Sequence, residues 1–472
     1  MDTRCDSPCA WKMLALSSSI LLCVACGSGA GGGVVAATPA GSVAQTATFE
    51  ADENPEGSRE ESRPLIPTIE ATAWRPDSPW TDVIQRCVLV DSIEESCPLS
   101  TLPFIGTGDR DPTHAEILDR LLVTHDWMGQ RFAELLDGAP DELVRLFGST
   151  TAIVIGSHVR PSNYNSLHGA IQLDPALLWL TREEKRTVSA KEDYRAGFGA
   201  DLQFMFFSRW AIGEARAWTF FDLTDDSERQ LADIRLPTMQ LLYHELAHAN
   251  DFMPRDQLAR LDPGDTVYQA IHEGDFEWLN QQLARDWPLT SDELKTLAAV
   301  RYRGEQPGDS QLSVQADYAG ALMHGDAAAR FYSYYTDAED LATTFALAMM
   351  YRHHGVSLNI GYVVKPADLD NVTCDDLEVG WGVRNRLADP AVLTRSVRLL
   401  KRLAYTSDTA LRRMVSDVQA SPQVLMRAGE SWCTNHRALP LTRSTRTAAH
   451  KETGVHLMRE RDAPPGVPTK AM

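Results

Sequence analysis

The hydrophobic pattern of the chain divides it into helical and strand-like stretches. Apolar residues recur every three to four positions through 113–136, which predicts an amphipathic helix, and 140–147 predicts a shorter one. The next stretches are short and rich in β-branched or aromatic residues, as strands are: 150–159, 170–173 and 201–208. Beyond Pro237 the pattern is mostly helical again.

This order, with strands first and helices afterwards, predicts an α+β domain. We expect the domain to span 83–438, with a sheet lobe at about 150–236 and a mainly helical lobe at about 237–438. The flanking segments contain too few large apolar residues to offset the entropy lost on ordering them. Residues 26–82 are therefore predicted to be a flexible tether, and residues 439–472 a disordered tail.

The N-terminal residues have the features of an export signal. An apolar stretch, too short to span a membrane stably, follows a region with two basic residues. It ends in Cys-Val-Ala-Cys-Gly-Ser, which resembles a bacterial lipoprotein signal, so residues 1–25 are expected to be removed and Cys26 to be acylated. Gly27 after that cysteine implies the outer membrane or the periplasmic face of the cell envelope. The alternative, cleavage at an ordinary Ala-x-Ala-like site, predicts a secreted protein.

The charge of the chain excludes one class of partner. There are 45 Lys and Arg residues against 65 Asp and Glu, which gives a formal net charge of −20. A sequence-independent nucleic-acid binder needs a basic surface, so that class is excluded. No run of about eighteen apolar residues occurs, which excludes a polytopic membrane protein. Membrane contact is expected only through the N-terminal lipid.

The cysteines agree with export. Four of the eight stand in the leader, and four stand in the predicted domain: Cys87, Cys97, Cys374 and Cys433. An even number in an oxidising compartment predicts two disulfides, for which three pairings exist. We favour Cys87–Cys97 with Cys374–Cys433, because the first pair closes a short loop. A four-cysteine zinc site is the alternative, but no C-x-x-C spacing supports it.

The chemistry of the chain is concentrated in one motif, His244-Glu245-Leu246-Ala247-His248, which has the pattern H-E-x-x-H. Pro237 is expected in the first turn of its helix, and apolar residues at helical spacing predict that the helix is buried. Residues four apart lie on one face, so both histidines can point at one Zn²⁺. Glu245 lies beside them, where a carboxylate can take a proton from a water that zinc acidifies. The alternative is a surface pair of histidines without a metal.

On this motif, the stretch from about 150 to 354 resembles the zincin fold of metallopeptidases. A catalytic zinc site needs a third protein ligand and one open position. The metzincin branch has Gly and then His or Asp at fixed distances after the last histidine, where this chain has Asp251 and Pro254. The aspzincin motif is also absent. The resemblance therefore implies the gluzincin branch, in which a glutamate on a later helix is the third ligand.

The later helix is predicted at residues 335–346, which resemble the E-x-x-A-E-x-F ligand helix of gluzincins of the anthrax lethal factor type. The resemblance implies that Glu339 is the third zinc ligand, with Asp340 as the alternative. Thr343 stands where that helix has its second acidic residue. Tyr332 matches the tyrosine that donates a hydrogen bond to the oxyanion in the transition state. The neighbouring alternatives for that role are Tyr334 and Tyr335.

Two further features have open alternatives. Asp251, one turn after His248, is either a residue that orients a zinc ligand or part of a solvated helix end. Residues 169–174 resemble the edge strand that zincins lay over their cleft, where a substrate peptide adds as an antiparallel strand. A plain core strand is the other interpretation.

The sequence therefore predicts an exported, lipid-anchored, zinc-dependent hydrolase of the cell envelope, and specifically a gluzincin-type endopeptidase acting on a peptide or protein. Zinc would be held by His244, His248 and Glu339, with Glu245 as the general base and Tyr332 at the oxyanion. One alternative is a surface lipoprotein that binds a partner or cell-wall polymer on a catalytically inactive zincin scaffold. A zincin that cleaves a non-peptide amide is another.

Overall fold

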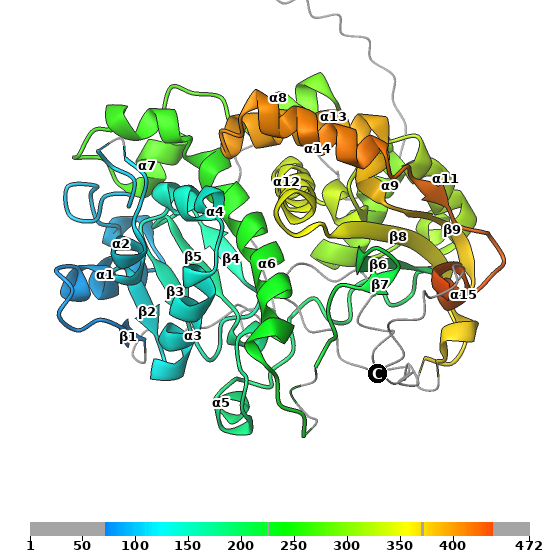
Figure 1. Ribbon diagram of the computed structural model, residues 1–472, viewed down its shortest axis with the longest axis horizontal. Coiled ribbons are helices and arrows are strands. Elements are labelled where there is room, and N and C mark those ends of the chain that lie inside the picture. Colours follow the sequence, from blue (N-terminus) through cyan, green and yellow to red (C-terminus); the bar gives the residue numbers. More distant parts are fainter. Residues whose placement is uncertain (1–70, 109, 222, 224–225, 370–371, 438–472) are drawn as a thin grey trace, which may run out of the picture. The chain divides into compact units, whose positions relative to one another are not determined.

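The computed structural model of the protein describes residues 71–437, apart from 109, 222, 224–225 and 370–371 (Figure 1). The expected signal peptide, Cys26 and the tail at 439–472 lie outside the described residues, as does most of the tether. The end of the tether differs from the prediction, because residues 71–82 belong to the fold. Ala71 is completely buried, and the Trp74 indole donates a hydrogen bond to Asp126.

The first sheet has five short strands in the order β1-β2-β3-β5-β4. Its strands are β1 (Thr72–Ala73), β2 (Leu121–Val123), β3 (Ile153–Ile155), β4 (Asn163–Asn165) and β5 (Ala170–Leu173). The three inner strands are parallel, and the two edge strands β1 and β4 are antiparallel to them. Its nearby helices are α1 (Thr81–Val88), α2 (His114–Leu118), α3 (Asp126–Asp137) and α4 (Asp141–Leu146).

One predicted helix is wrong. The stretch 113–136 contains a strand, β2, between α2 and α3. All three residues of β2 are buried, as expected for an inner strand of a parallel sheet that is covered on both faces. A short, wholly apolar run has no periodicity that separates a strand from a helix. The helix predicted at 140–147 and the strands predicted at 150–159 and 170–173 are confirmed as α4, β3 and β5.

The second sheet is antiparallel, in the order β10-β9-β8-β6-β7. Its strands are β6 (Phe204–Ile212), β7 (Ala215–Arg216), β8 (Ser357–Val364), β9 (Val379–Arg384) and β10 (Val424–Leu425). Three of them come from 237–438, so the division into a sheet lobe and a helical lobe differs from the prediction. The reason is that β8 finds its pairing partner, β6, far upstream in the chain. The mixed α+β class is confirmed.

The remaining helices follow β5 and β7 in the chain. They are α5 (Arg182–Arg186), α6 (Leu231–Phe252), α7 (Val267–His272), α8 (Leu279–Asp286), α9 (Asp292–Ala298), α10 (Asp309–Leu312), α11 (Ala316–His324), α12 (Asp337–His354), α13 (Pro390–Leu403), α14 (Asp408–Gln419) and α15 (Trp432–Arg437). None of the helices in the described ranges combines the length and the apolar character needed to cross a membrane.

Two long helices, α6 and α12, pack side by side between the sheets (Figure 1). Helix α6 contacts β4 and β5 of the first sheet, and α12 contacts β8 of the second. Helix α6 begins at Leu231, so Pro237 lies inside it and not in its first turn as expected. Two contacts stabilise the helical turns at 231–236, before Pro237. Ile234 is fully buried, and Asp233 accepts a hydrogen bond from the Gln230 backbone. The two helices therefore form the centre of the core.

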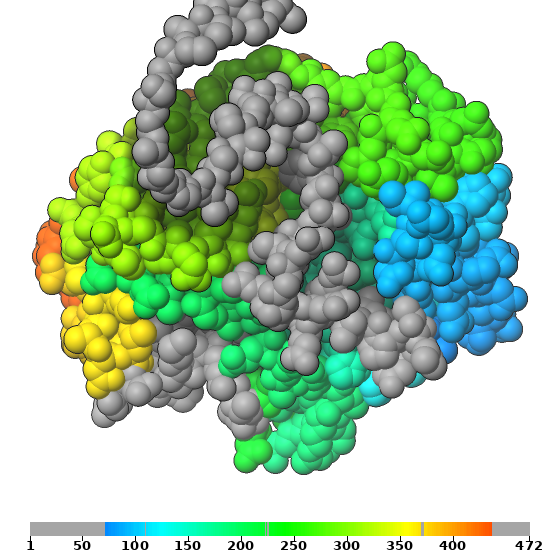
Figure 2. Space-filling model, turned by 180° about the vertical axis from the view of Figure 1, so that it is seen from behind, coloured from blue at the N-terminus to red at the C-terminus, as the bar shows by residue number. Residues whose placement is uncertain are grey.

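The segment after α1 lies beside the segment that leads into α7, seen as blue next to bright green in Figure 2. The Leu99 amide donates a hydrogen bond of 2.8 Å to the Asp265 carbonyl, and Pro98 forms a β-bridge with Thr266. These two contacts join the segment between α6 and α7 to the segment between α1 and α2.

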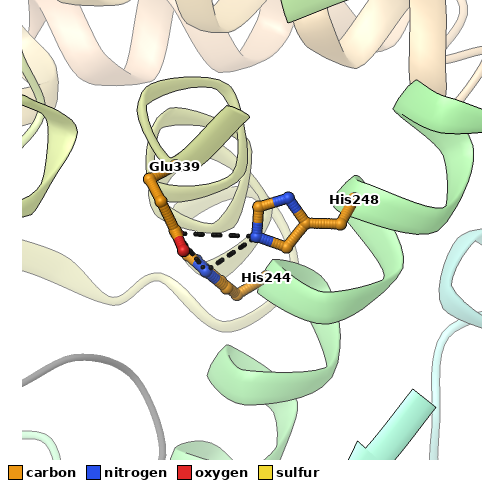
Figure 3. A group of neighbouring side chains, drawn as sticks. All are labelled: His244, His248 and Glu339. Carbon is orange, nitrogen blue, oxygen red and sulfur yellow. Dashed lines mark hydrogen bonds and ion pairs between the residues drawn. The ribbon is translucent and has the colours of Figure 1, made fainter. Parts of the chain in front are cut away.

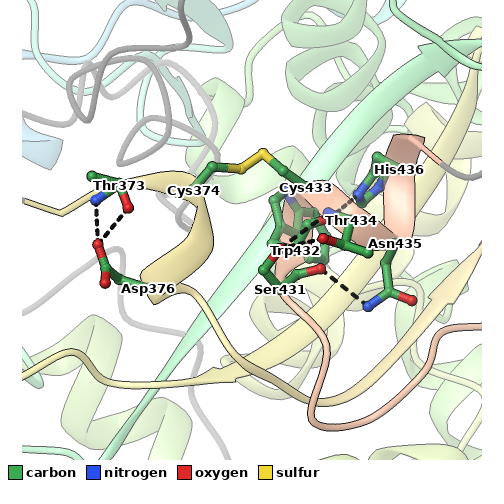
Figure 4. Close-up of a disulfide and its surroundings, with 9 residues drawn as sticks. All are labelled: Thr373, Cys374, Asp376, Ser431, Trp432, Cys433, Thr434, Asn435 and His436. Atoms are coloured by element: carbon green, nitrogen blue, oxygen red, sulfur yellow. Dashed lines mark hydrogen bonds between the residues drawn. A yellow bond between two sulfur atoms is a disulfide. The ribbon is translucent and has the colours of Figure 1, made fainter.

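Both predicted disulfides are present. Cys87 joins Cys97 with 5.4 Å between their Cα atoms, and Cys374 joins Cys433 with 5.6 Å. The second bridge connects the turn before β9 to α15, next to Trp432 (Figure 4). Trp432 is fully buried and packs against Phe207 of β6. The bridge therefore closes the C-terminal helix onto the second sheet.

Candidate metal centre

The two histidines of the motif lie one turn apart on α6, on the side that faces α12 (Figure 3). Their exposed fractions are 2% for His244 and 8% for His248. The two Nε2 atoms are 3.3 Å apart. Helix geometry accounts for this, because residues four apart fall on the same face. The surface-pair alternative is therefore wrong, since both imidazoles lie inside the protein.

The third member of the group is Glu339, in the first turn of α12. The Thr336 side chain caps this helix by accepting a hydrogen bond of 3.1 Å from the Glu339 amide. The Oε2 atom of Glu339 lies 2.9 Å from His244 Nε2 and 3.5 Å from His248 Nε2 (Figure 3). One ligand atom from each of the three residues lies within 4.8 Å of the others. The structure thus brings together the three side chains that the sequence predicted.

The donor set fits a metal ion. Two imidazole nitrogens and a carboxylate oxygen are ligands that zinc accepts, and here the three atoms lie within 4.8 Å of one another. Burial raises the pKa of Glu339, but the two histidines lower it further, so it lies well below the usual value and the carboxylate stays ionised. Burial lowers the pKa of His244, which favours the neutral imidazole that a metal needs.

Glu245 is buried beside the histidines. Burial raises its pKa to about 8, although His248 and Arg195 lower it. A hydrogen bond from the Tyr164 backbone, on the edge strand β4, also favours the charged form. A carboxyl with a pKa near neutrality is suited to accepting and returning a proton.

Tyr332 is the tyrosine whose hydroxyl reaches this group. It lies in a short 3-10 helix, Phe331–Tyr334, and its Oη donates a hydrogen bond of 2.8 Å to Glu339 Oε1. The hydroxyl of Tyr334 is instead bonded to Asp326, at 3.1 Å. Tyr335 stacks on the Tyr332 ring, with 5.6 Å between the centroids. Of the three predicted candidates, Tyr332 is therefore the one that contacts a candidate ligand.

Asp340, the alternative third ligand, does not belong to the group of three and instead contacts Arg395. It is buried and forms an ion pair with Arg395, which is also completely buried.

Asp251 does not lie at a solvated helix end. Its carboxylate accepts hydrogen bonds from the backbone and side chain of Asn280, at 2.9 and 2.6 Å, and so caps α8. Burial lowers the pKa of His248, but Glu339, with smaller contributions from Glu245 and Asp251, raises it above the usual value.

The edge strands of the first sheet are β1 and β4, so of the two interpretations of residues 169–174 the plain core strand is the one that the structure shows. That stretch forms β5, which lies between β3 and β4. Helix α6 contacts both strands, so the edge at β4 is the one beside the candidate metal centre. The short strand at 163–165 has two asparagines and a tyrosine, and no alternating apolar pattern marked it in the sequence.

Sequence reasoning also missed Asp193 and Arg195. Both are buried, although they lie in an irregular segment between α5 and β6. Charged residues in a segment without periodicity usually indicate an exposed loop. The spacing Asp-x-Arg is the single local signal, and it is too common to identify a site.

Comparisons with known proteins found no relative of this chain. No protein-family model, no curated protein and no solved structure matches the chain. The case for function therefore rests on the geometry of the residues described above.

Proposed function

We propose that this protein is an exported zinc-dependent hydrolase that cleaves peptide bonds, an endopeptidase of gluzincin type. The observation that carries the proposal is the proximity of His244, His248 and Glu339, which come from two helices far apart in the sequence and bring one ligand atom each to within 4.8 Å of the others. A zincin-like arrangement, with the site between a small sheet and a helical region, is part of the proposal.

His244, His248 and Glu339 would hold a zinc ion with three protein ligands, the number typical of catalytic zinc sites. Zinc bound there supplies a Lewis acid that makes water a stronger acid and polarises a carbonyl group. Glu339, kept ionised by its surroundings, contributes the negative ligand. The two buried imidazoles contribute the nitrogen ligands.

The remaining chemistry belongs to side chains of the chain itself. Glu245 takes the proton of the attacking water and passes it to the leaving amine. A cation at the three ligands would lower the pKa of Glu245 below its value of about 8, which keeps it ionised at neutral pH. Tyr332 donates a hydrogen bond to the carbonyl oxygen as its negative charge grows. The free edge of β4, beside α6, offers a place for an extended peptide.

The test is the replacement Glu245→Gln, with Glu183→Gln as the matched control. Glu183 has 77% of its side chain exposed, away from the buried group. We expect Glu245→Gln to keep about one zinc per chain and to lose hydrolysis by about 10² to 10⁴. The control variant should keep both the bound zinc and the hydrolytic activity. Hydrolysis that persists in Glu245→Gln would contradict its role as the base.

Export and lipid anchoring belong to the same proposal. The two disulfides fit an oxidising compartment outside the cytosol. Replacing Cys26 by Ser should move the protein from the membrane fraction to the soluble fraction of the envelope. A protein that stays in the membrane fraction would argue against an acyl anchor at that position.

A second candidate function is binding of a partner or cell-wall polymer on an inactive scaffold. One observation favours it: the Nδ1 atoms of His244 and His248 find no hydrogen-bond partner among the described residues. Histidines that bind catalytic zinc usually donate this hydrogen to a carboxylate, a carbonyl or water. A zinc-loaded protein that hydrolyses no peptide and no amide would favour this candidate.

A further inference from the structure

His248 belongs to a group of three stacked aromatic rings beside the candidate metal centre. Phe252 stacks on the His248 imidazole, with 6.2 Å between the ring centroids and 13° between the ring planes. Tyr164 stacks in turn on Phe252, at 6.1 Å and 24°. His248 and Phe252 are four residues apart on α6 and so share one face of it, whereas Tyr164 comes from the edge strand β4. The stack therefore joins a candidate ligand to the first sheet.

The Phe252 ring is held in place at the end of α6. Phe252 is the last residue of that helix and has an exposed fraction of 8%. Trp278, which directly precedes α8, packs edge-on against it, with 5.0 Å between the centroids and 75° between the planes. The neighbouring Asp251 accepts hydrogen bonds from Asn280 of α8, at 2.9 and 2.6 Å. These contacts join α6 to α8 and leave the Phe252 ring little freedom to turn.

The orientation of the His248 ring needs a support of this kind. The torsion that turns an imidazole about its Cβ–Cγ bond is broad, so the surroundings of the ring decide its plane. In zinc sites a hydrogen bond at the second ring nitrogen usually does this. The Nδ1 atom of His248 finds no such partner among the described residues. Rotation of the ring would change the position of Nε2, which lies 3.3 Å from His244 Nε2 and 3.5 Å from Glu339 Oε2.

Stacking on Phe252 can supply this support, because a ring that tilts away from a flat neighbour loses its contact with it. Phe252 has no polar group, so it acts on His248 through its shape alone. The Tyr164 hydroxyl is buried and finds no hydrogen-bond partner among the described residues, so the ring is the part of this side chain that contacts its neighbours. The other histidine differs, since Tyr332 lies 6.3 Å from His244 with the ring planes tilted by 32°. The stacked arrangement is thus particular to His248.

We propose that Phe252 is a positioning residue of the metal centre. Its stack with Tyr164 holds the His248 imidazole in the orientation that brings Nε2 next to Glu339 and His244, and so takes the place of a hydrogen bond at Nδ1. This inference rests on the proposed function, because it assumes that the three ligands bind zinc. It adds two residues that act on the metal only through His248.

Phe252→Leu tests the inference, with Phe104→Leu as the matched control. Both replacements remove a ring from the same apolar cluster, in which Phe104 is 1% exposed. Among the described residues it is Phe252, and not Phe104, that stacks on His248. A third variant, Tyr164→Leu, removes the outer ring of the stack at a partly buried position on β4. The zinc affinity of the full chain is measured by competition with a chelator, and the visible absorption of the Co²⁺-loaded protein reports the arrangement of the ligands.

We expect Phe252→Leu to weaken zinc binding by about 10-fold or more and to change the Co²⁺ spectrum, as the loss of a residue that orients a ligand does. Tyr164→Leu should weaken zinc binding by about 2- to 10-fold, the loss of one aromatic pair. Phe104→Leu should match the wild type in both measurements.

Two results would overturn the inference. Wild-type affinity and spectrum in Phe252→Leu, or equal weakening in Phe252→Leu and Phe104→Leu, would show that Phe252 serves only the packing of the core. If Phe252→Leu does not fold, Tyr164→Leu decides the question, and a wild-type result in that variant would overturn the inference as well. A wild-type protein that takes up neither metal would instead overturn the proposed function beneath it.

Discussion

The hydroxyl of Tyr332 donates a hydrogen bond to Oε1 of Glu339, while the other oxygen of the same carboxylate faces the two histidines. The tyrosine comes from the 3-10 turn just before α12, and the glutamate from the first turn of that helix. The Glu339 carboxylate therefore contacts the histidines of α6 with one oxygen and Tyr332 with the other. This connection links the orientation of the candidate ligand to the residue expected at the oxyanion.

The first prediction concerns Tyr332→Phe. If the phenol stabilises the transition state, kcat should fall by about 10² while zinc remains bound. If it only orients Glu339, zinc affinity should fall by about 10-fold or more, with kcat of the zinc-saturated protein unchanged. We expect the first result. Zinc titration and steady-state kinetics separate the two, and Tyr318→Phe, at an exposed tyrosine bonded to Glu293, is the control.

The second prediction concerns Glu339→Gln, with Asp337→Asn as the matched control in the same helical turn. Asp337 is exposed and lies outside the group of three. Removing the charged ligand should weaken zinc binding by about 100-fold or more, as measured by competition with a chelator. The control should bind zinc as the wild type does. Equal affinity in both variants would mean that the metal is held elsewhere.

The third prediction concerns the two disulfides. A bridge stabilises the fold mainly by restricting the unfolded chain, and more so for a longer loop. The cysteines of the pairs are separated by 59 residues for Cys374–Cys433 and by 10 for Cys87–Cys97. Replacing both cysteines by Ala should cost about 4 kcal/mol for the longer loop and about 3 kcal/mol for the shorter one. Urea unfolding measures both losses, and the reverse order would show that native packing outweighs loop entropy.

The fourth prediction concerns pH and Glu142, which joins α4 to the end of α12. Its carboxylate accepts hydrogen bonds from Arg352, at 2.6 and 2.9 Å, and contacts His353 Nε2 at 2.9 Å. Burial raises the pKa of Glu142, but His353 and Arg352 lower it more, to about 2, against an ordinary value of 4.5. The charged form is thus favoured in the folded state, and the stability it contributes is present above pH 4.5 and lost as pH falls toward 2.

The free energy of unfolding of the wild type should therefore exceed that of Glu142→Gln at pH 6, and the difference should shrink between about pH 4.5 and pH 3. Urea midpoints in the presence of a chelator measure this without a contribution from bound metal. A difference that stays constant across this range would mean that Glu142 acts through packing alone.

Much of the candidate site follows from local sequence. The spacing of His244 and His248 places them on one face of any helix, whatever surrounds it, because the backbone hydrogen bonds of a helix set its period. The cap at Thr336 is also local. The choice between Glu339 and Asp340 as the third ligand does not follow from local sequence. Adjacent residues of a helix point to different faces, and the sequence does not say which face meets the histidines. In the structure Glu339 lies beside the histidines, whereas Asp340 pairs with Arg395.

The sequence by itself thus determined the helix that carries the histidines and the α+β class, and it favoured the cysteine pairing that the structure shows. Only the tertiary structure decided that β2 interrupts a helical pattern, that β8 and β9 join β6 in a second sheet, and that Asp193 and Arg195 form a buried ion pair. The physical reason is the range of the interactions. A helix satisfies its hydrogen bonds within four residues, whereas a strand or a buried ion pair depends on partners that the chain brings together only on folding.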